Sequence, residues 1–142
     1  MLSAMSFREK SAWAMGALVA AAGSWYFIKL GAAAWTPGAA PPLGLLVRYV
    51  FGIIIGSIAV QTLIVVLMPR DADAPADERE RAARRQAGHW SGELLALGVI
   101  LGLLWFLAHG DGTLLFHSLF AALIISQVAD SVLEAWFLRR GF

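Results

Sequence analysis

The sequence contains no cysteine and little charge, and both shortages narrow the possible classes of protein. Without cysteine the 142-residue chain can form no disulfide, thiolate metal site or iron–sulfur cluster. Only 15% of the residues are charged and 59% are hydrophobic, whereas about a quarter of the residues of a soluble domain are charged. The net charge of +1 gives no reason to expect a nucleic acid partner. The composition therefore favours a membrane protein.

The sequence also lacks the motifs of common enzymatic sites. It contains no Walker loop, nucleophile elbow, HExxH zinc motif or dinucleotide fingerprint. No segment outside the apolar stretches is long enough to form an enzymatic domain. We therefore expect no enzymatic activity, no cofactor and no metal.

Four apolar stretches are each long enough to cross the hydrocarbon core of a bilayer, which takes about 20 helical residues. Proline and glycine residues mark the boundaries between these stretches, as expected where helices stop. The spans lie near residues 12–31, 43–68, 90–108 and 114–138. The sequence predicts an all-α, integral membrane four-helix bundle that forms a single domain over residues 1–142, with a charged connector at 69–89.

The distribution of basic residues predicts the orientation of the bundle. Only Lys29 and Arg48 lie near one end. The others lie at the opposite end: Arg8, Lys10, Arg70, Arg79, Arg81, Arg84, Arg85, Arg139 and Arg140. By the positive-inside rule, both termini and the connector are cytoplasmic. Because Ala, Gly and Arg are abundant and Lys is scarce, we expect a multi-pass protein of the bacterial inner membrane.

The second and fourth spans resemble one another. They align without gaps at an offset of 69 residues, which places Phe51 over Phe120 and Gln61 over Asp130. The first and third spans align at an offset of 79 residues. This pattern suggests two antiparallel hairpins related by tandem duplication, with an axis along the membrane normal. The alternative is an antiparallel bundle without a duplication.

Glycine pairs predict where the helices pack closely. Lipid tails are as apolar as leucine, so helices in a bilayer associate by close packing and hydrogen bonds. Small-xxx-small patterns occur on the second span at Gly52 and Gly56, and on the third at Gly98 and Gly102. We expect these glycines to pack within the chain, and contact with a second copy in a homodimer is the alternative.

Polar side chains in the cytoplasmic half of the spans predict a site. At 100° per residue, Gln127, Asp130 and Glu134 share one stripe of the fourth span. Asp130 lies nine residues before Arg139, about 13 Å along the helix axis, which is well inside the membrane. The whole predicted polar cluster comprises Gln61, His89, Glu93, Gln127, Asp130 and Glu134.

Three roles for the polar cluster are open. The side chains could tie the helices together, with Asp130 hydrogen-bonded to Gln61. They could form a proton or cation site open to the cytoplasm, because ionisable groups inside a membrane often mark such pathways. A metal site is the third alternative, since His89 and Glu93, like Asp130 and Glu134, have the i, i+4 spacing of ligands on one helix face.

The charged connector predicts a surface for a protein partner. Its second half reads as a short amphipathic helix that runs into the third span, with i, i+4 ion pairs between Asp77 and Arg81 and between Glu80 and Arg84. A solvated helix without a partner is the alternative. The candidate docking residues are Asp77, Glu78, Arg79, Glu80, Arg81, Arg84 and Arg85.

Two stretches carry a family resemblance. The opening "MSFREKSAWA" and the run "DADAPADERERAARR" resemble a prokaryotic family of small four-helix integral membrane proteins of unknown function. The family signature Asp-Glu-Arg-Asp/Glu-Arg, which precedes the third span, is met by residues 77–81. The resemblance implies the fold and the membrane location and implies no activity.

These observations predict a non-enzymatic membrane protein that acts as an accessory, assembly or regulatory subunit. Its connector helix would contact a larger membrane or cytoplasmic protein. A minimal dimeric transporter or ion or proton conduit that uses the polar cluster is the main alternative. A metal- or cofactor-binding membrane protein is the third.

Overall fold

Four α-helices make up the fold. The computed structural model describes residues 6–31, 36, 38–69 and 77–140, and these residues form no strand. The helices are α1 (Phe7–Leu30), α2 (Leu43–Leu67), α4 (Glu78–His109) and α5 (Gly112–Arg140). All four are long and apolar enough to cross a membrane, which confirms the predicted all-α class and the four apolar helices. Arg70, one of the basic residues used for orientation, lies outside the described residues.

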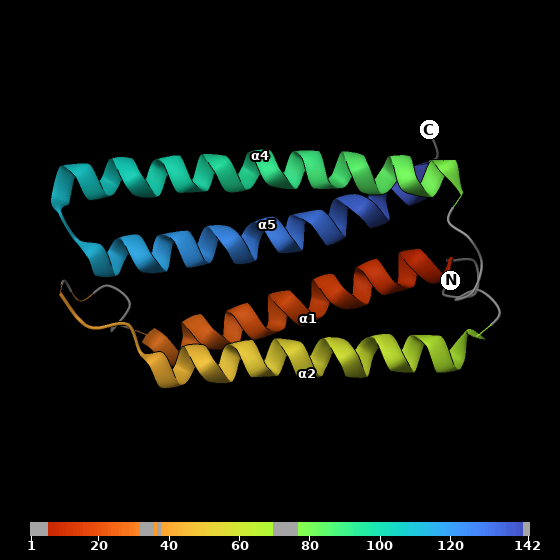
Figure 1. Ribbon diagram of the computed structural model, residues 1–142, viewed down its shortest axis with the longest axis horizontal. Helices are drawn as coiled ribbons and strands as arrows, with labels where there is room; N and C mark the ends of the chain where they lie inside the picture. The colour runs from red at the N-terminus through yellow and green to blue at the C-terminus, as the bar shows by residue number, and fades with distance from the viewer. Residues whose placement is uncertain (1–5, 32–35, 37, 70–76, 141–142) are drawn as a thin grey trace.

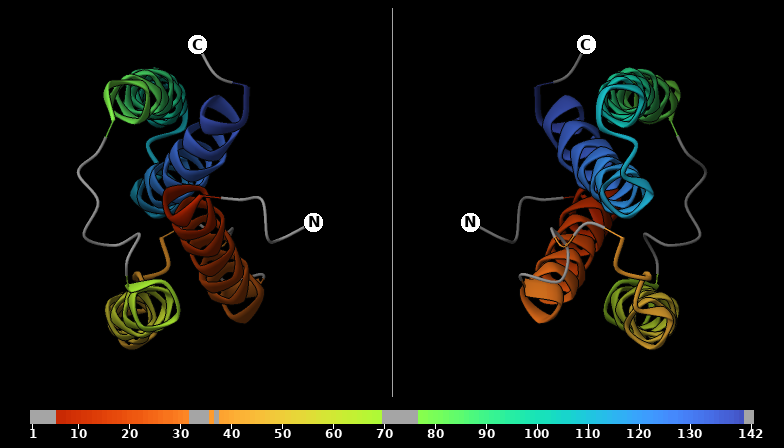
Figure 2. Two further views of the ribbon diagram at one scale, coloured as in Figure 1. Left: turned by 90° about the vertical axis from the view of Figure 1, so that its right-hand side faces the viewer. Right: turned by 90° about the vertical axis from the view of Figure 1, so that its left-hand side faces the viewer.

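The helices lie side by side in the order α4, α5, α1, α2 (Figure 1). Neighbours in this row pack with their backbones close together, whereas within the described residues α1 and α4 are joined by the Arg8–Glu80 ion pair, α2 and α5 by the Tyr49–Phe120 ring contact, and α2 and α4 by at most a marginal contact. Seen end-on, α2 and α4 lie on the same side of a central α1–α5 pair (Figure 2). We call the end at which α1 and α4 begin the connector end, and the opposite end the turn end.

The neighbours in this row do not have the symmetry of a tandem repeat. Consecutive helices do form two antiparallel hairpins, α1 with α2 and α4 with α5. In a parallel repeat, however, the contact between α1 and α5 would have a counterpart between α4 and α2. That contact is at most marginal within the described residues. A duplication in the origin of the sequence therefore stays a prediction.

Local sequence signals begin and end the helices. The Ser6 side chain accepts a hydrogen bond from the Glu9 backbone N–H at 3.2 Å and begins α1. Asp77 and Glu80 form a capping box at the start of α4. Gly110, in the left-handed conformation with φ 68°, ends α4. Asp111 then begins α5 by accepting the backbone N–H of Thr113 at 2.9 Å.

Helix α4 is longer than the span expected at residues 90–108. It runs without a break over 32 residues, which is about 48 Å at 1.5 Å per residue. A hydrocarbon core is about 30 Å thick. The predicted connector helix is therefore the first part of α4 and extends beyond the length needed for a span.

Two clusters hold three helices together at each end of the molecule. At the turn end, Tyr26 of α1, Tyr49 of α2 and Phe120 of α5 pack edge to face, with ring centroids 4.8–5.7 Å apart. At the connector end, Ala83 and Ala87 of α4 pack against Phe137 of α5. Ion pairs described below add α1 to this second cluster. Helices α1 and α5 thus belong to both clusters, whereas α2 and α4 each belong to one.

Three of the four predicted packing glycines lie against a neighbouring helix. A Cβ atom added to Gly98 would lie 2.5 Å from the Cβ of Ala122, and one on Gly102 would lie 2.9 Å from the Ser118 hydroxyl. A Cβ on Gly56 would lie 2.9 Å from Leu18 on α1. Gly52 faces open space. These contacts are within the chain, and Gly52 has no neighbour among the described residues.

The glycine contacts give a first prediction. Gly98→Leu should lower the free energy of unfolding by about 1–3 kcal/mol, because the new side chain must push α4 away from α5. Gly52→Leu, the matched control, should change it by less than about 0.5 kcal/mol because the position is open. Denaturant unfolding in detergent, followed by circular dichroism, measures both variants. Equal stability of the two variants would contradict the α4–α5 contact.

Candidate functional site

Charged side chains at the connector end join three helices. The Arg8 Nε of α1 lies 2.7 Å from Glu80 Oε2 of α4. On the next residue of α1, the Glu9 carboxylate accepts a hydrogen bond from the Arg139 guanidinium of α5. Glu9 is only 6% exposed, whereas the Arg139 side chain is more than half exposed. Two consecutive α1 residues therefore fix the start of α4 and the end of α5 at the same level.

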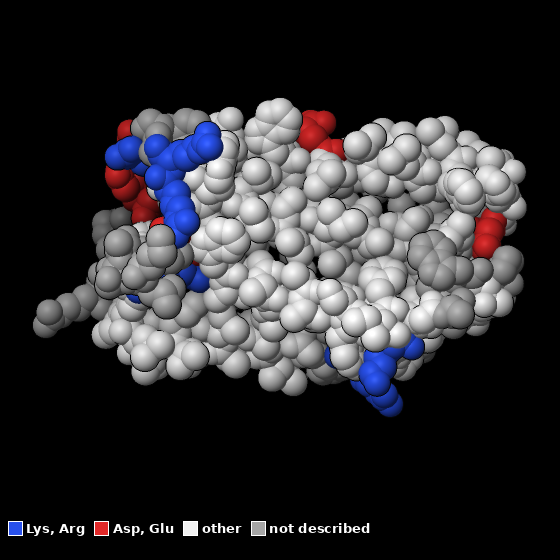
Figure 3. Space-filling model, turned by 180° about the vertical axis from the view of Figure 1, so that it is seen from behind, with Lys and Arg blue, Asp and Glu red and all other residues white. Residues whose placement is uncertain are grey.

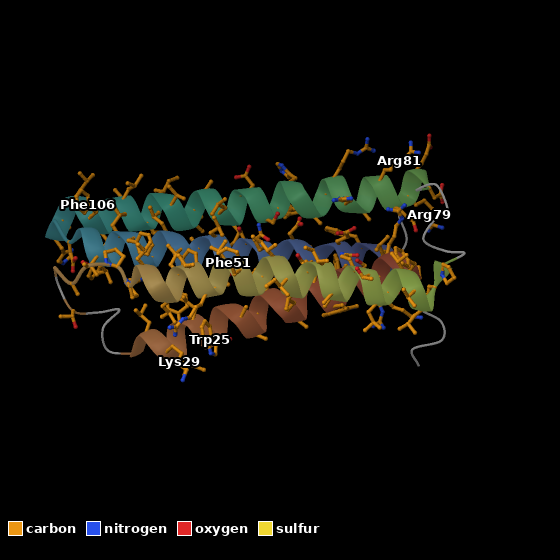
Figure 4. All side chains as sticks on the ribbon, turned by 60° about the horizontal axis from the view of Figure 1, so that its bottom comes forward. Trp25, Lys29, Phe51, Arg79, Arg81 and Phe106 are labelled. Atoms are coloured by element: carbon orange, nitrogen blue, oxygen red, sulfur yellow. The ribbon has the colours of Figure 1, made fainter. Side chains whose placement is uncertain are left out.

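The candidate docking residues divide into two groups. Asp77 and Glu80 are engaged within the chain, because they cap α4 and Glu80 also binds Arg8. Arg79 and Arg81 are exposed and extend from the connector end of α4 (Figure 4). Glu78, Arg84 and Arg85 are also exposed. A partner could therefore contact the cationic residues of this helix without breaking its cap.

Asp130 and Glu134 face α4 and the connector end. The Ser91 hydroxyl of α4 lies 3.1 Å from Asp130 Oδ1, and Ser91 is buried. Glu134 interacts electrostatically with Arg84 of α4 and with Arg8 of α1. The two carboxylates are half-buried. They therefore contribute polar contacts between α5 and its neighbours at two successive levels.

Gln61 does not reach Asp130. Its side chain instead exchanges hydrogen bonds with the Ser11 hydroxyl of α1, at 3.0 and 3.2 Å. The physical reason is the order of the row, in which α1 lies between α2 and α5. The expected hydrogen bond is replaced by two separate ones, Gln61–Ser11 and Asp130–Ser91.

Three other members of the predicted polar cluster are exposed. His89 and Glu93 lie on α4, and the His89 ring lies edge to face with the ring of its neighbour Trp90. Gln127 lies on α5, and its side-chain amide has no hydrogen-bond partner among the described residues. Within the described residues, no three His, Asp or Glu side chains lie close enough to hold a metal ion. The structure therefore brings Asp130 and Glu134 together and leaves His89, Glu93 and Gln127 apart.

Several buried polar residues were not among the sequence candidates. Glu9 is one, and its burial follows from the contact of α1 with α5, which no local pattern encodes. His117 and Tyr26, which are 2% and 0% exposed, are two more. His117 Nδ1 and the Tyr26 hydroxyl are buried without a hydrogen-bond partner among the described residues. The sequence shows that both residues are polar, but only the structure shows that these two atoms are buried and make no hydrogen bond among the described residues.

Comparison with protein-family models, with curated proteins and with solved structures gives no match for this chain. The resemblance to a family of small four-helix membrane proteins therefore stays a prediction.

The Glu9–Arg139 ion pair gives the second prediction. Glu9→Gln should lower the free energy of unfolding by about 1–2 kcal/mol, because the amide oxygen accepts from Arg139 without the negative charge that strengthens this hydrogen bond; the effect stays modest because Arg139 is screened by solvent. Glu78→Gln, a change of the same chemistry at an exposed position, should cost less than about 0.5 kcal/mol. Thermal and denaturant unfolding in one detergent compare the two. If both variants unfold alike, Glu9 does not join α1 to α5.

Proposed function

We propose that this protein is a non-enzymatic accessory, assembly or regulatory subunit of the bacterial inner membrane, with both termini in the cytoplasm. The observation that carries the proposal is the open row of helices. Within the described residues, α2 and α4 lie on the same side of the α1–α5 pair and make at most a marginal contact. Because the described helices form a row rather than a closed ring, a helix of another membrane protein could pack on this side.

The exposed amide of Gln127 supports a helical partner on this side. Ile125 lines the grooves that α5 forms with α4 and with α1. Gln127 is two residues further along, about 200° around the helix, and therefore points to the opposite side of α5. Moving an amide from water into hydrocarbon without a hydrogen bond costs about 2–7 kcal/mol. A hydrogen bond from a neighbouring transmembrane helix removes this cost. Glutamine side chains are among those that form such bonds across helices.

The connector end of α4 supports a second contact, in the cytoplasm. Its exposed cationic residues, Arg79, Arg81 and Arg85, lie on a helix that the capping box and the Arg8–Glu80 ion pair hold rigid. A preorganised helix loses little conformational entropy on binding. An acidic surface on a larger protein would complement these residues.

A photo-crosslinking side chain at Gln127 tests this function. In native membranes it should give an adduct with a distinct protein, because the partner helix covers this position. The matched control is Ile100, an exposed residue in the middle of α4, which should give only lipid adducts. An adduct of twice the chain mass would show a homodimer instead, and lipid adducts alone at both positions would contradict the proposal.

A second candidate function is a proton or cation conduit formed by a dimer. The observation in its favour is that Asp130 and Glu134 are carboxylates half-buried in an apolar helix, which is costly unless paired or functional. Two chains would be needed to enclose a pathway.

Asp130→Asn separates the two functions. An accessory subunit should keep its stability within about 0.5 kcal/mol and keep its partner, because the amide oxygen still accepts the Ser91 hydroxyl. A conduit should lose proton flux into liposomes, since an amide cannot carry the proton. Asp130→Leu is the control, and it should weaken the α4–α5 contact in either case by removing the acceptor.

A further inference from the structure

A groove of about 730 Å³ runs along the α1–α5 pair. Small or branched apolar residues form most of its walls, including Ala20 on α1 and Ala121, Val128 and Val132 on α5. Its floor is closed where Gly23 meets Ile124, since a Cβ on Gly23 would lie 2.6 Å from that side chain. Figure 3 shows the molecule from behind, where charged atoms gather mainly at the two ends.

Polar groups occur on both walls at the end of the groove nearest the turn end. Ser24 of α1 is exposed, and its hydroxyl makes no hydrogen bond among the described residues. His117 of α5 lines the groove opposite and is 2% exposed; its Nδ1 is buried away from the groove, and its Nε2 makes no hydrogen bond among the described residues. The Ser118 hydroxyl, in contrast, bonds to the Leu115 carbonyl at 2.9 Å. Two polar side chains therefore face this end of the groove with unused hydrogen-bonding capacity.

Within the described residues, neither the Ser24 hydroxyl nor His117 Nδ1 makes a hydrogen bond. His117 lies in the turn-end cluster with its ring centroid 6.4 Å from that of Tyr26, whose own hydroxyl is unpartnered in the described chain. Water is absent from the hydrocarbon core, so such groups must find partners within the protein or on a ligand. An imidazole left without hydrogen bonds in a buried site is unfavourable. A ligand in the groove that accepts a hydrogen bond from Nε2 would remove part of this penalty.

The dimensions and charge of the groove define the class of ligand. From His117 to Val132 the groove follows 15 residues of α5, about 22 Å at 1.5 Å per residue, which suits one extended hydrocarbon chain. No charged side chain is among the described residues that line it. An anionic phospholipid headgroup would therefore lack a counter-charge. Phe27 beside Ser24 offers an aromatic surface to a flat ring.

We propose that this groove binds an isoprenoid quinone. The quinone ring lies beside Phe27, and its two carbonyl oxygens accept hydrogen bonds from Ser24 and from the His117 imidazole. The isoprenoid chain follows the groove along α1 and α5 toward Val132. The quinone binds as a ligand, and no electron transfer is included in the proposal. The site is separate from the partner surface at Gln127, so either can fail without the other.

Titration of the purified full-length protein in detergent with decylubiquinone tests the site. Quinones quench tryptophan fluorescence, and Trp25 is adjacent to Ser24 in the sequence. We expect saturable quenching, with Kd raised about fivefold by Ser24→Ala or by His117→Phe, as for the loss of one hydrogen bond. Ala20→Leu should fill the groove and raise Kd at least tenfold. Ala96→Leu, the same change at an exposed position of α4 outside the groove, should leave Kd unchanged.

Unfolding of the same variants without quinone separates a ligand site from a structural one. Because the His117 Nδ1 has no partner among the described residues, His117→Phe should leave the melting temperature unchanged or raise it while the affinity falls. Non-saturable quenching, equal Kd in all variants, or displacement of the quinone by phosphatidylglycerol at the same concentration would each overturn the proposal. If the His117→Phe variant unfolds, the imidazole is needed for the stability of the fold. The Kd values of Ser24→Ala and Ala20→Leu would then show whether the groove binds the quinone.

Discussion

The close approach of α1 and α5 is the contact on which the rest of the structure depends. Gly16 and Gly23 make it possible, because a Cβ on either would lie within 3 Å of Ser131 or Ile124. In a bilayer, apolar side chains gain no hydrophobic free energy by moving from lipid to another helix. Close packing of this kind is therefore a main source of helix association. Helix α2 packs on this pair at the turn end through the aromatic cluster. Helix α4 is bound to it at the connector end by the Arg8–Glu80 ion pair.

This central pair also separates the polar side chains. With α1 between α2 and α5, Gln61 bonds to Ser11 of α1, and Asp130 bonds to Ser91 of α4. The polar groups of the spans thus form several local ties and no continuous chain within the described residues. Such an arrangement suits a structural role for Asp130 better than a pathway through one molecule. It leaves Gln127 as the polar side chain whose environment a neighbouring protein would complete.

The two sides of the central pair suit different neighbours. On one side lie the exposed amide of Gln127 and the helices α2 and α4, which make at most a marginal contact within the described residues; these features favour a protein helix with hydrogen-bonding groups. On the other, the groove is apolar along most of its length and polar only near His117 and Ser24, which favours a long-chain ligand with an uncharged head. A subunit of this kind could associate with a larger membrane protein and hold a lipid-soluble molecule beside it.

The helices of this protein could be predicted from local signals. Hydrophobic length identified four helices, proline and glycine marked their boundaries, and Asp77 with Glu80 marked the start of α4, because all these signals are local along the chain. Helical periodicity also placed Asp130 and Glu134 on one face. Which helix meets which face could be learned only from the packed structure. Lipid and protein are equally apolar neighbours for most side chains, so hydropathy contains no record of helix order. For this reason Gln61 could not be assigned to Ser11, nor could the burial of Glu9 and His117 be foreseen.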